Sequence, residues 1–148
     1  MIEIRETSAI SPEAVLMLAE LNAALTQITG ASGEGSFSVE DVENERSAFV
    51  VAYADGVPYG CGALRPFTET AAEIKRVYAR PNTQGVGTAI VQTLEEKARA
   101  QGYTRLVLET RRVNTAAIAF YHKLGFSVCP NFGKYTEQET ALCMAKKL

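Results

Sequence analysis

Apolar residues along this chain recur with two different periods, and the change of period separates strands from helices. Segments in which apolar and polar residues alternate, and short apolar runs rich in β-branched residues, predict strands. These segments are residues 2–5, 48–53, 57–64, 72–79, 105–110, 126–129 and 141–145. Asp55-Gly56 stands between two of them and is typical of a tight type I′ hairpin turn.

Three segments show helical spacing and have recognisable ends. Ser11 and Pro12 predict the cap and first turn of a helix that ends at Gly30. The residues predicted to share its inward face are Leu18, Leu21, Leu25 and Ile28. A second helix is expected over residues 85–101, and a third from the cap Asn114 to Leu124. The Gly- and Ser-rich stretch 30–38 is expected to be mobile.

Composition narrows the class of protein. The chain has 148 residues, 47% of them apolar, and a net charge of −2 with acidic and basic residues interspersed. We therefore expect one globular α+β domain over residues 1–148, without nucleic-acid binding, because that function needs a clustered basic excess. No signal peptide or membrane-spanning run is apparent, which predicts a cytoplasmic protein. The three cysteines have no CxxC spacing and the chain has one histidine, so no metal is expected.

The segment Arg80–Ala89, RPNTQGVGTA, joins a predicted strand to a predicted helix. Backbone N–H groups at a helix N-terminus favour a phosphate, and Gly85 and Gly87 would let the backbone approach it closely. A tight strand-to-helix turn with no ligand is the competing interpretation. No Lys-Ser/Thr pair follows the glycines and no third glycine completes GxGxxG, so P-loop and dinucleotide-binding folds are excluded.

A second segment, Asn114–Phe126, reads NTAAIAFYHKLGF. Taken alone, it is a capped amphipathic helix with aromatic residues packed inward. The two segments in this order, separated by a strand, carry more information than either alone. Together they resemble the GNAT superfamily of acetyl-CoA-dependent N-acetyltransferases. The residues that carry the resemblance, which extends from Phe49 to the C-terminus, are Gln84, Gly87 and Ala89, Asn114, Tyr121, Gly125-Phe126 and Glu73.

The resemblance implies a fold and a set of binding residues. The fold is a mixed, mostly antiparallel sheet of six to seven strands, with helices on both faces and a V-shaped gap between strands 73–79 and 105–110. The pantetheine arm of acetyl-CoA would enter this gap. The residues implied for acetyl-CoA binding are Val77, Tyr78, Ala79, Gln84, Gly85, Val86, Gly87, Thr88, Ala89, Asn114, Ala117 and Tyr121.

Two residues are implied in catalysis. Tyr121 would protonate the leaving thiolate, since a phenol and coenzyme A are similarly weak acids. Glu73 would deprotonate the acceptor ammonium, directly or through water. The alternatives are a core tyrosine bonded to a backbone carbonyl and a strand-end carboxylate paired with Lys75 or Arg76. Cys61 or Cys129 could be proposed as an acetylated nucleophile, but neither has an apparent histidine partner.

The resulting hypothesis is an N-acetyltransferase that transfers acetyl from acetyl-CoA to a primary amine of a small molecule in a ternary complex. A non-catalytic acyl-CoA sensor and an enzyme acting on protein or peptide amines are the alternatives, and a homodimer is left open. On the acceptor side, residues 29–37 could close as a lid, with Phe37 as an apolar wall and Glu34 attracting an ammonium. An anionic acceptor or the coenzyme phosphates could be attracted by Lys75, Arg76, Arg111 and Arg112.

Overall fold

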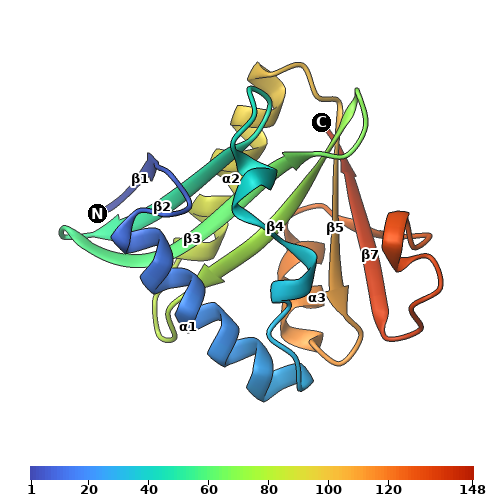
Figure 1. Cartoon of the computed structure of the whole chain (residues 1–148), viewed down its shortest axis with the longest axis horizontal. Coiled ribbons are helices and arrows are strands. Elements are labelled where there is room, and N and C mark those ends of the chain that lie inside the picture. Colours follow the sequence, from blue (N-terminus) through green and yellow to red (C-terminus); the bar gives the residue numbers. More distant parts are fainter.

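The predicted strands form one seven-stranded sheet with the order β1-β2-β3-β4-β5-β7-β6 (Figure 1). The computed structural model describes all residues, 1–148. The strands are β1 Ile2–Glu6, β2 Ala48–Ala54, β3 Val57–Pro66, β4 Ala71–Ala79, β5 Arg105–Arg111, β6 Ser127–Cys129 and β7 Ala141–Lys147. Only β4 and β5 are parallel, and every other neighbouring pair is antiparallel. This confirms the mixed, mostly antiparallel sheet of the α+β fold.

The helices begin and end at the residues that the local signals indicate. They are α1 Pro12–Thr29, α2 Val86–Ala100 and α3 Thr115–Lys123, with short 3₁₀ turns at Glu34–Ser36, Val39–Val42 and Gly133–Tyr135. The Ser11 hydroxyl accepts from the Ala14 N–H at 3.2 Å, and the Asn114 side chain accepts from the Ala117 N–H at 3.2 Å. Gly30, at φ 83°, ends α1 in the left-handed conformation.

Helices cover both faces of the sheet, and alternate residues of each strand serve two separate cores. In β2, Val50 and Ala52 belong to the larger core, which α2 and α3 cover. Phe49 and Val51 belong to the smaller core, which α1 covers. The period-2 pattern of the buried strands therefore fixes which side chains face α1 and which face α2.

The inward face of α1 differs from the prediction. Ala14, Met17 and Leu21 are the buried residues of this helix, whereas Ile28 is 50% exposed. Ile28 is exposed because the last turns of α1 extend beyond the strands against which the helix packs (Figure 1). These turns reach the region between β4 and β5, where Leu25 and Thr29 line a cavity.

The sheet opens in its middle, at the only parallel pair. β4 and β5 are in register at Ala71–Arg105, Ala72–Leu106 and Glu73–Val107, and beyond Glu73 they separate. In the same region β4 has a bulge against β3, and Arg76 adopts φ 56°, a left-handed conformation that a non-glycine residue rarely takes. The splayed strand pair that the resemblance implied is therefore present.

Candidate active site

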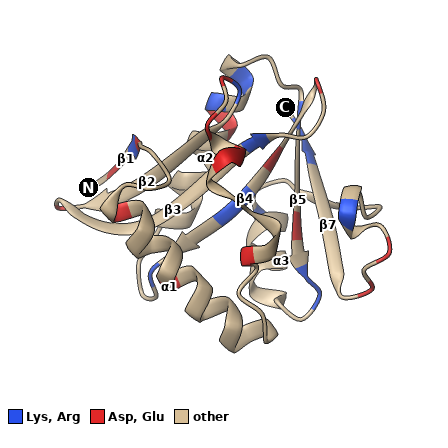
Figure 2. Ribbon diagram, viewed as in Figure 1, with Lys and Arg blue, Asp and Glu red and all other residues tan.

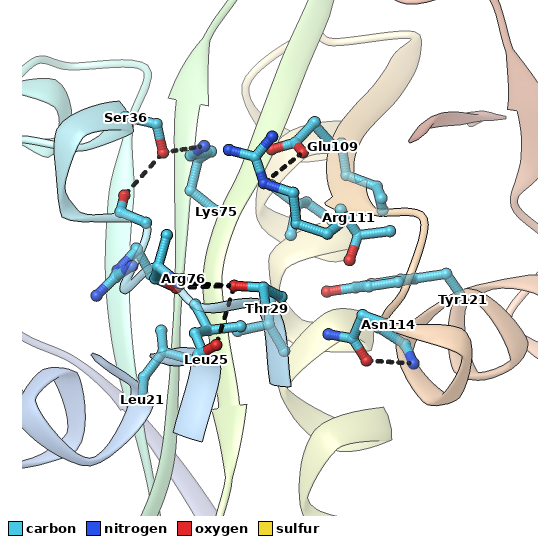
Figure 3. A pocket seen from close by; sticks show the side chains of 17 residues that line it. Leu21, Leu25, Thr29, Ser36, Lys75, Arg76, Glu109, Arg111, Asn114 and Tyr121 are labelled. Carbon is cyan, nitrogen blue, oxygen red and sulfur yellow. Dashed lines mark hydrogen bonds and ion pairs between the residues drawn. The ribbon is translucent and has the colours of Figure 1, made fainter. Parts of the chain in front are cut away.

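A cavity of about 140 Å³ lies at the point where β4 and β5 separate (Figure 3). Its wall combines residues from the end of α1 and the segment after it, from β4, from β5 and from α3. The lining residues are Leu21, Leu25, Thr29, Ala31, Gly33, Ser36, Ile74, Lys75, Arg76, Val77, Leu108, Glu109, Thr110, Arg111, Asn114, Ala117 and Tyr121. Residues from both faces of the sheet thus contribute to one site at the gap between β4 and β5.

Tyr121 reaches this cavity from α3. Its ring packs edge-on against Phe120 and Phe126, with centroids 5.0 and 5.5 Å away, and only 8% of the residue is exposed. The hydroxyl points into the cavity and has no hydrogen-bond partner within the chain (Figure 3). Burial raises the pKa of this phenol well above its ordinary value. Tyr121 therefore holds its proton at neutral pH and has a free O–H to donate.

The N-terminus of α2 is suited to an anion. Gly85 precedes the helix at φ 78°, and the first intrahelical bond of this turn runs from the Ala89 N–H to the Gly85 carbonyl at 3.0 Å. The N–H groups of Val86, Gly87 and Thr88 have no acceptor within the chain. Unpaired N–H groups at a helix N-terminus bind phosphates. The turn from Gln84 to Ala89 therefore presents free N–H donors, and phosphate binding by this turn stays a prediction.

This turn lies close to the cavity. A Cβ atom on Gly87 would be 3.2 Å from the Phe120 ring of α3 and 3.9 Å from the Ala79 Cβ of β4. Val77, Asn114, Ala117 and Tyr121 line the cavity itself. The structure thus brings four of the predicted binding residues into the cavity wall, whereas Ala79 and residues 84–89 lie next to it and do not line it.

Tyr78 is directed elsewhere. Its hydroxyl donates to Glu20 of α1 at 3.0 Å, on the opposite face of the sheet from α2. Any contact of Tyr78 with acetyl-CoA would therefore have to come from its backbone.

Glu73 is almost fully buried, with 3% of the residue exposed, and it does not line the cavity. Its carboxylate accepts from Arg65 Nε at 2.9 Å and from the Tyr135 hydroxyl at 3.3 Å, while Lys75 Nζ lies 4.0 Å away. The surroundings of Glu73 therefore match the competing interpretation, in which the carboxylate is paired with a cation. Its main partner is Arg65, however, and not Lys75 or Arg76. Tyr135 and Lys75 stand between Glu73 and the cavity.

A second carboxylate, Glu109 of β5, does line the cavity, and the sequence analysis missed it. Its Oε2 atom is buried and accepts no hydrogen bond, and the nearest cation is Arg111, whose Nε lies 3.9 Å away. Burial raises the pKa of this carboxyl group. The signal that could have found it is the alternation within RLVLETR, which places an acidic residue on the face of β5 opposite Leu106 and Leu108.

Lys75 faces the cavity from β4 and is 7% exposed. Its ammonium donates to the Ser36 hydroxyl at 2.9 Å and to the Tyr135 hydroxyl at 2.8 Å. Burial lowers its pKa to about 8. Figure 2 shows the corresponding Lys and Arg positions on β4 facing an acidic position on β5.

The segment after α1 is held in place rather than free. Ser36 is bonded by Lys75 and, through its carbonyl, by Arg65 at 3.1 Å, and Arg76 donates to the Ser32 carbonyl at 3.0 Å. Cations of β3 and β4 thus bond this stretch at Ser32 and Ser36, and its mobility stays a prediction. Phe37 packs into the smaller core instead of the cavity, and Glu34 accepts from Asn22 at 2.8 Å.

The chain belongs to the acetyltransferase (GNAT) family, whose model matches residues 18–126. IAA acetyltransferase from Azospirillum brasilense is 30% identical over 150 residues, covering 99% of this chain and 98% of the relative. The uncharacterised N-acetyltransferase YsnE from Bacillus subtilis is 32% identical, covering 76% of this chain and 78% of the relative.

Solved structures share the complete fold. A Klebsiella pneumoniae protein described as an acyl-CoA N-acyltransferase superposes with a TM-score of 0.86 at 26% identity, covering 100% of this chain and 98% of the other. A GNAT acetyltransferase from Elizabethkingia anophelis, solved with acetyl-CoA bound, shares the fold at a TM-score of 0.73 and 20% identity, with 99% of this chain and 98% of the other covered. The chain is thus an N-acetyltransferase that uses acetyl-CoA as cosubstrate.

None of the helices combines the length and the apolar character needed to cross a membrane.

Proposed function

We propose that the enzyme acetylates a primary amine of a small molecule, by direct attack on acetyl-CoA in a ternary complex. The observation that carries this proposal is the cavity at the gap in the sheet, with Tyr121 on its α3 side and Glu109 and Lys75 on its α1 side. Its volume of about 140 Å³ suits a small molecule. Residues 31–36 lie over it and are bonded to β3 and β4, which restricts the approach of a polypeptide.

Acetyl-CoA supplies an activated acetyl thioester. In our proposal the Val86, Gly87 and Thr88 N–H groups bind its pyrophosphate, and the unpaired edge of β4 around Val77 binds the pantetheine arm. A backbone N–H at Val77 or Tyr78 would polarise the thioester carbonyl. Asn114 and Ala117 complete the wall beside Tyr121.

The proton transfers fall to Tyr121 and a carboxylate. The amine nitrogen forms a bond to the acetyl carbon as the carbon–sulfur bond breaks, and Tyr121 gives its proton to the departing sulfur. An acceptor that binds as an ammonium loses one proton to a base before it attacks. The nitrogen loses a second proton as the amide forms, and through solvent this proton replaces the one that Tyr121 gave to sulfur. Glu73 can act as that base only through Tyr135 and Lys75, which link it to the cavity, whereas Glu109 is in direct contact with the cavity. Both carboxylates therefore enter the proposal, in different positions.

The experiment is a screen for coenzyme A release from acetyl-CoA with small amines, peptides and intact proteins as acceptors. The proposal expects turnover with a small amine that exceeds turnover with every macromolecule. Acetyl-CoA binding without release of coenzyme A would instead support a non-catalytic sensor. If peptides or proteins are preferred, the small-molecule proposal is wrong.

The base is identified by Glu73→Gln and Glu109→Gln, assayed over a range of pH with the best amine. Loss of the base should lower kcat by about 10²- to 10⁴-fold and move the rise of activity to higher pH, because the ammonium must then lose its proton to solvent. A variant whose activity rises at the same pH as the wild type has kept the base. If both variants keep the wild-type profile, neither carboxylate is the base.

A further inference from the structure

Glu109 and Arg111 lie two residues apart on β5 and both line the cavity, and each has binding capacity that the chain does not use. Arg111 Nη1 donates to Gln138 at 3.2 Å and to Thr140 at 3.1 Å, and both acceptors are neutral. Arg111 Nε and Nη2 donate no hydrogen bond within the chain; Nε faces the Glu109 carboxylate only in a long ion pair of 3.9 Å, so the edge that binds carboxylates in a bidentate manner keeps its donors free.

Glu109 carries the opposite charge, and its carboxylate likewise lacks hydrogen-bond partners within the chain. Its buried Oε2 atom accepts no hydrogen bond, and the 3.9 Å to Arg111 Nε is too long for one. A buried carboxylate oxygen without a donor is costly, and native structures seldom leave one without a reason. The other carboxylate oxygen, Oε1, is not buried in this way and also accepts no hydrogen bond within the chain, so a ligand could donate to Oε1 of Glu109 and accept from Arg111 at the same time.

The other charges of the cavity wall favour an anion in addition to an amine. Lys75, Arg76 and Arg111 contribute positive charge, whereas Glu109 is the only acidic residue of the wall. Arg76 has no carboxylate within ion-pair distance, and its buried Nε has no partner. Figure 3 shows Lys75 on the β4 side facing Glu109 and Arg111 on the β5 side.

We infer that the acceptor is zwitterionic, an amino acid or a close analogue, with its ammonium at Glu109 and its carboxylate at Arg111. Lys75 faces the same carboxylate from β4, and Leu21 and Leu25 of α1 offer an apolar surface to the carbon skeleton. Glu109, Arg111 and Tyr121 all line this one cavity, with Tyr121 entering it from α3 (Figure 3). This inference rests on the proposed function, since it names the acceptor of that reaction.

Matched pairs of acceptors test it. Coenzyme A release is measured with L-leucine and isoamylamine, with L-phenylalanine and 2-phenylethylamine, and with L-alanine and ethylamine, so that each pair differs in the carboxylate alone. We expect at least one amino acid to have a kcat/KM about tenfold or more above that of its partner, the size of effect that a charged hydrogen bond contributes. Equal values within every pair would overturn the inference.

Arg111→Gln removes the proposed carboxylate partner, and Arg112→Gln is the matched control. Arg112 is exposed, bonds the Glu139 carbonyl at 2.9 Å and does not line the cavity. Arg111→Gln should raise KM for the amino acid about tenfold or more and leave KM for the decarboxylated amine unchanged, while Arg112→Gln changes neither. Arg111→Lys keeps the positive charge but lacks the bidentate edge, so its KM for the amino acid should lie between those of the wild type and Arg111→Gln. Such an intermediate value also shows that the effect of Arg111→Gln is not a folding defect.

A binding measurement separates this inference from the proposed function. Calorimetric titration of the enzyme with the amino acid, with coenzyme A present and no acetyl donor, reports acceptor binding alone. Binding that Arg111→Gln abolishes, without coenzyme A release from acetyl-CoA, would refute the proposed function and leave only an amino-acid binding site at Glu109 and Arg111. Coenzyme A release with amines but no effect of the carboxylate or of Arg111→Gln would refute the inference and keep the function.

Discussion

Glu73 of β4 and Val107 of β5 form the last register pair between these two strands. β4 continues to Ala79 and β5 to Arg111, so the facing edges of both strands have no ladder partner beyond this pair. An unpaired strand edge accepts an extended ligand as an additional strand. The same pair thus marks the inner end of the gap and the depth to which an extended arm can enter it.

Loss of the Tyr121 hydroxyl is expected to lower kcat. Tyr121→Phe keeps the ring contacts with Phe120 and Phe126 and deletes only the oxygen. We expect a loss of about 10²- to 10⁴-fold in the chemical step, as for other general acids, with acetyl-CoA affinity nearly unchanged. A single-turnover assay measures this step free of product release. Tyr53→Phe, at a tyrosine remote from the cavity, is the control, and a wild-type rate in Tyr121→Phe would contradict the assignment.

A negative charge at Gly87 is expected to weaken acetyl-CoA binding. Gly87→Glu places a carboxylate among the free N–H groups of the α2 N-terminus, where it competes with and repels the pyrophosphate. Its Cβ would also lie 3.2 Å from the Phe120 ring, which must shift by a few tenths of an ångström. Gln92→Glu adds the same charge at an exposed position of the same helix. Calorimetry should show weaker binding in the first variant alone, and equal affinities would remove the basis for this site.

The elements and their ends were predictable because their signals are local. Ser11, Gly30 and Asn114 act on the backbone within a few residues, and Asp55-Gly56, at φ 51° and 79°, sets the hairpin that joins β2 to β3. The phosphate-binding turn and the Asn114–Tyr121 spacing are local in the same sense. These features could therefore be found without knowledge of the tertiary structure.

The charge arrangement of the site depends on contacts that are distant in sequence. Arg65 opposes Glu73 because the register of β3 and β4 pairs them, and that register includes a bulge near Cys61. Glu109 and Lys75 line the same cavity from two strands that are neighbours in space but separated in sequence by the whole of α2. The sequence analysis singled out Glu73 from the family pattern, and no local signal indicated that Arg65 would engage it.

Cys61 is expected to be unreactive and dispensable for chemistry. Its side chain is fully buried, its Sγ donates to the Arg76 carbonyl at 3.4 Å, and burial raises its pKa to about 12. A thiol in this state is a poor nucleophile. Cys61→Ala should keep kcat within about twofold, and the native enzyme should leave this cysteine unlabelled by a thiol reagent. Trapping of an acetyl group on Cys61 would instead indicate a covalent intermediate.

Lys75 is expected to make the stability of the enzyme depend on pH in the alkaline range. Burial lowers the pKa of its ammonium from the ordinary value of 10.5 to about 8 in the folded state. Between these two values the unfolded chain binds more protons at this position than the folded chain does. The free energy of unfolding therefore rises with pH across this window, by on the order of 3 kcal/mol for a full separation of the two values.

The measurement is urea denaturation of the wild type and of Lys75→Met at pH values from 7 to 10. Other groups titrate in the same range, including cysteines and tyrosines, but they are present in both proteins and largely cancel in the difference. The free energy of unfolding of the wild type, relative to Lys75→Met, should increase steadily above about pH 8. Lys147→Met, which removes an exposed lysine, should leave a curve parallel to the wild type. Parallel curves for Lys75→Met as well would mean that Lys75 is not held in a desolvated site, and would place the acceptor side of the cavity in contact with water.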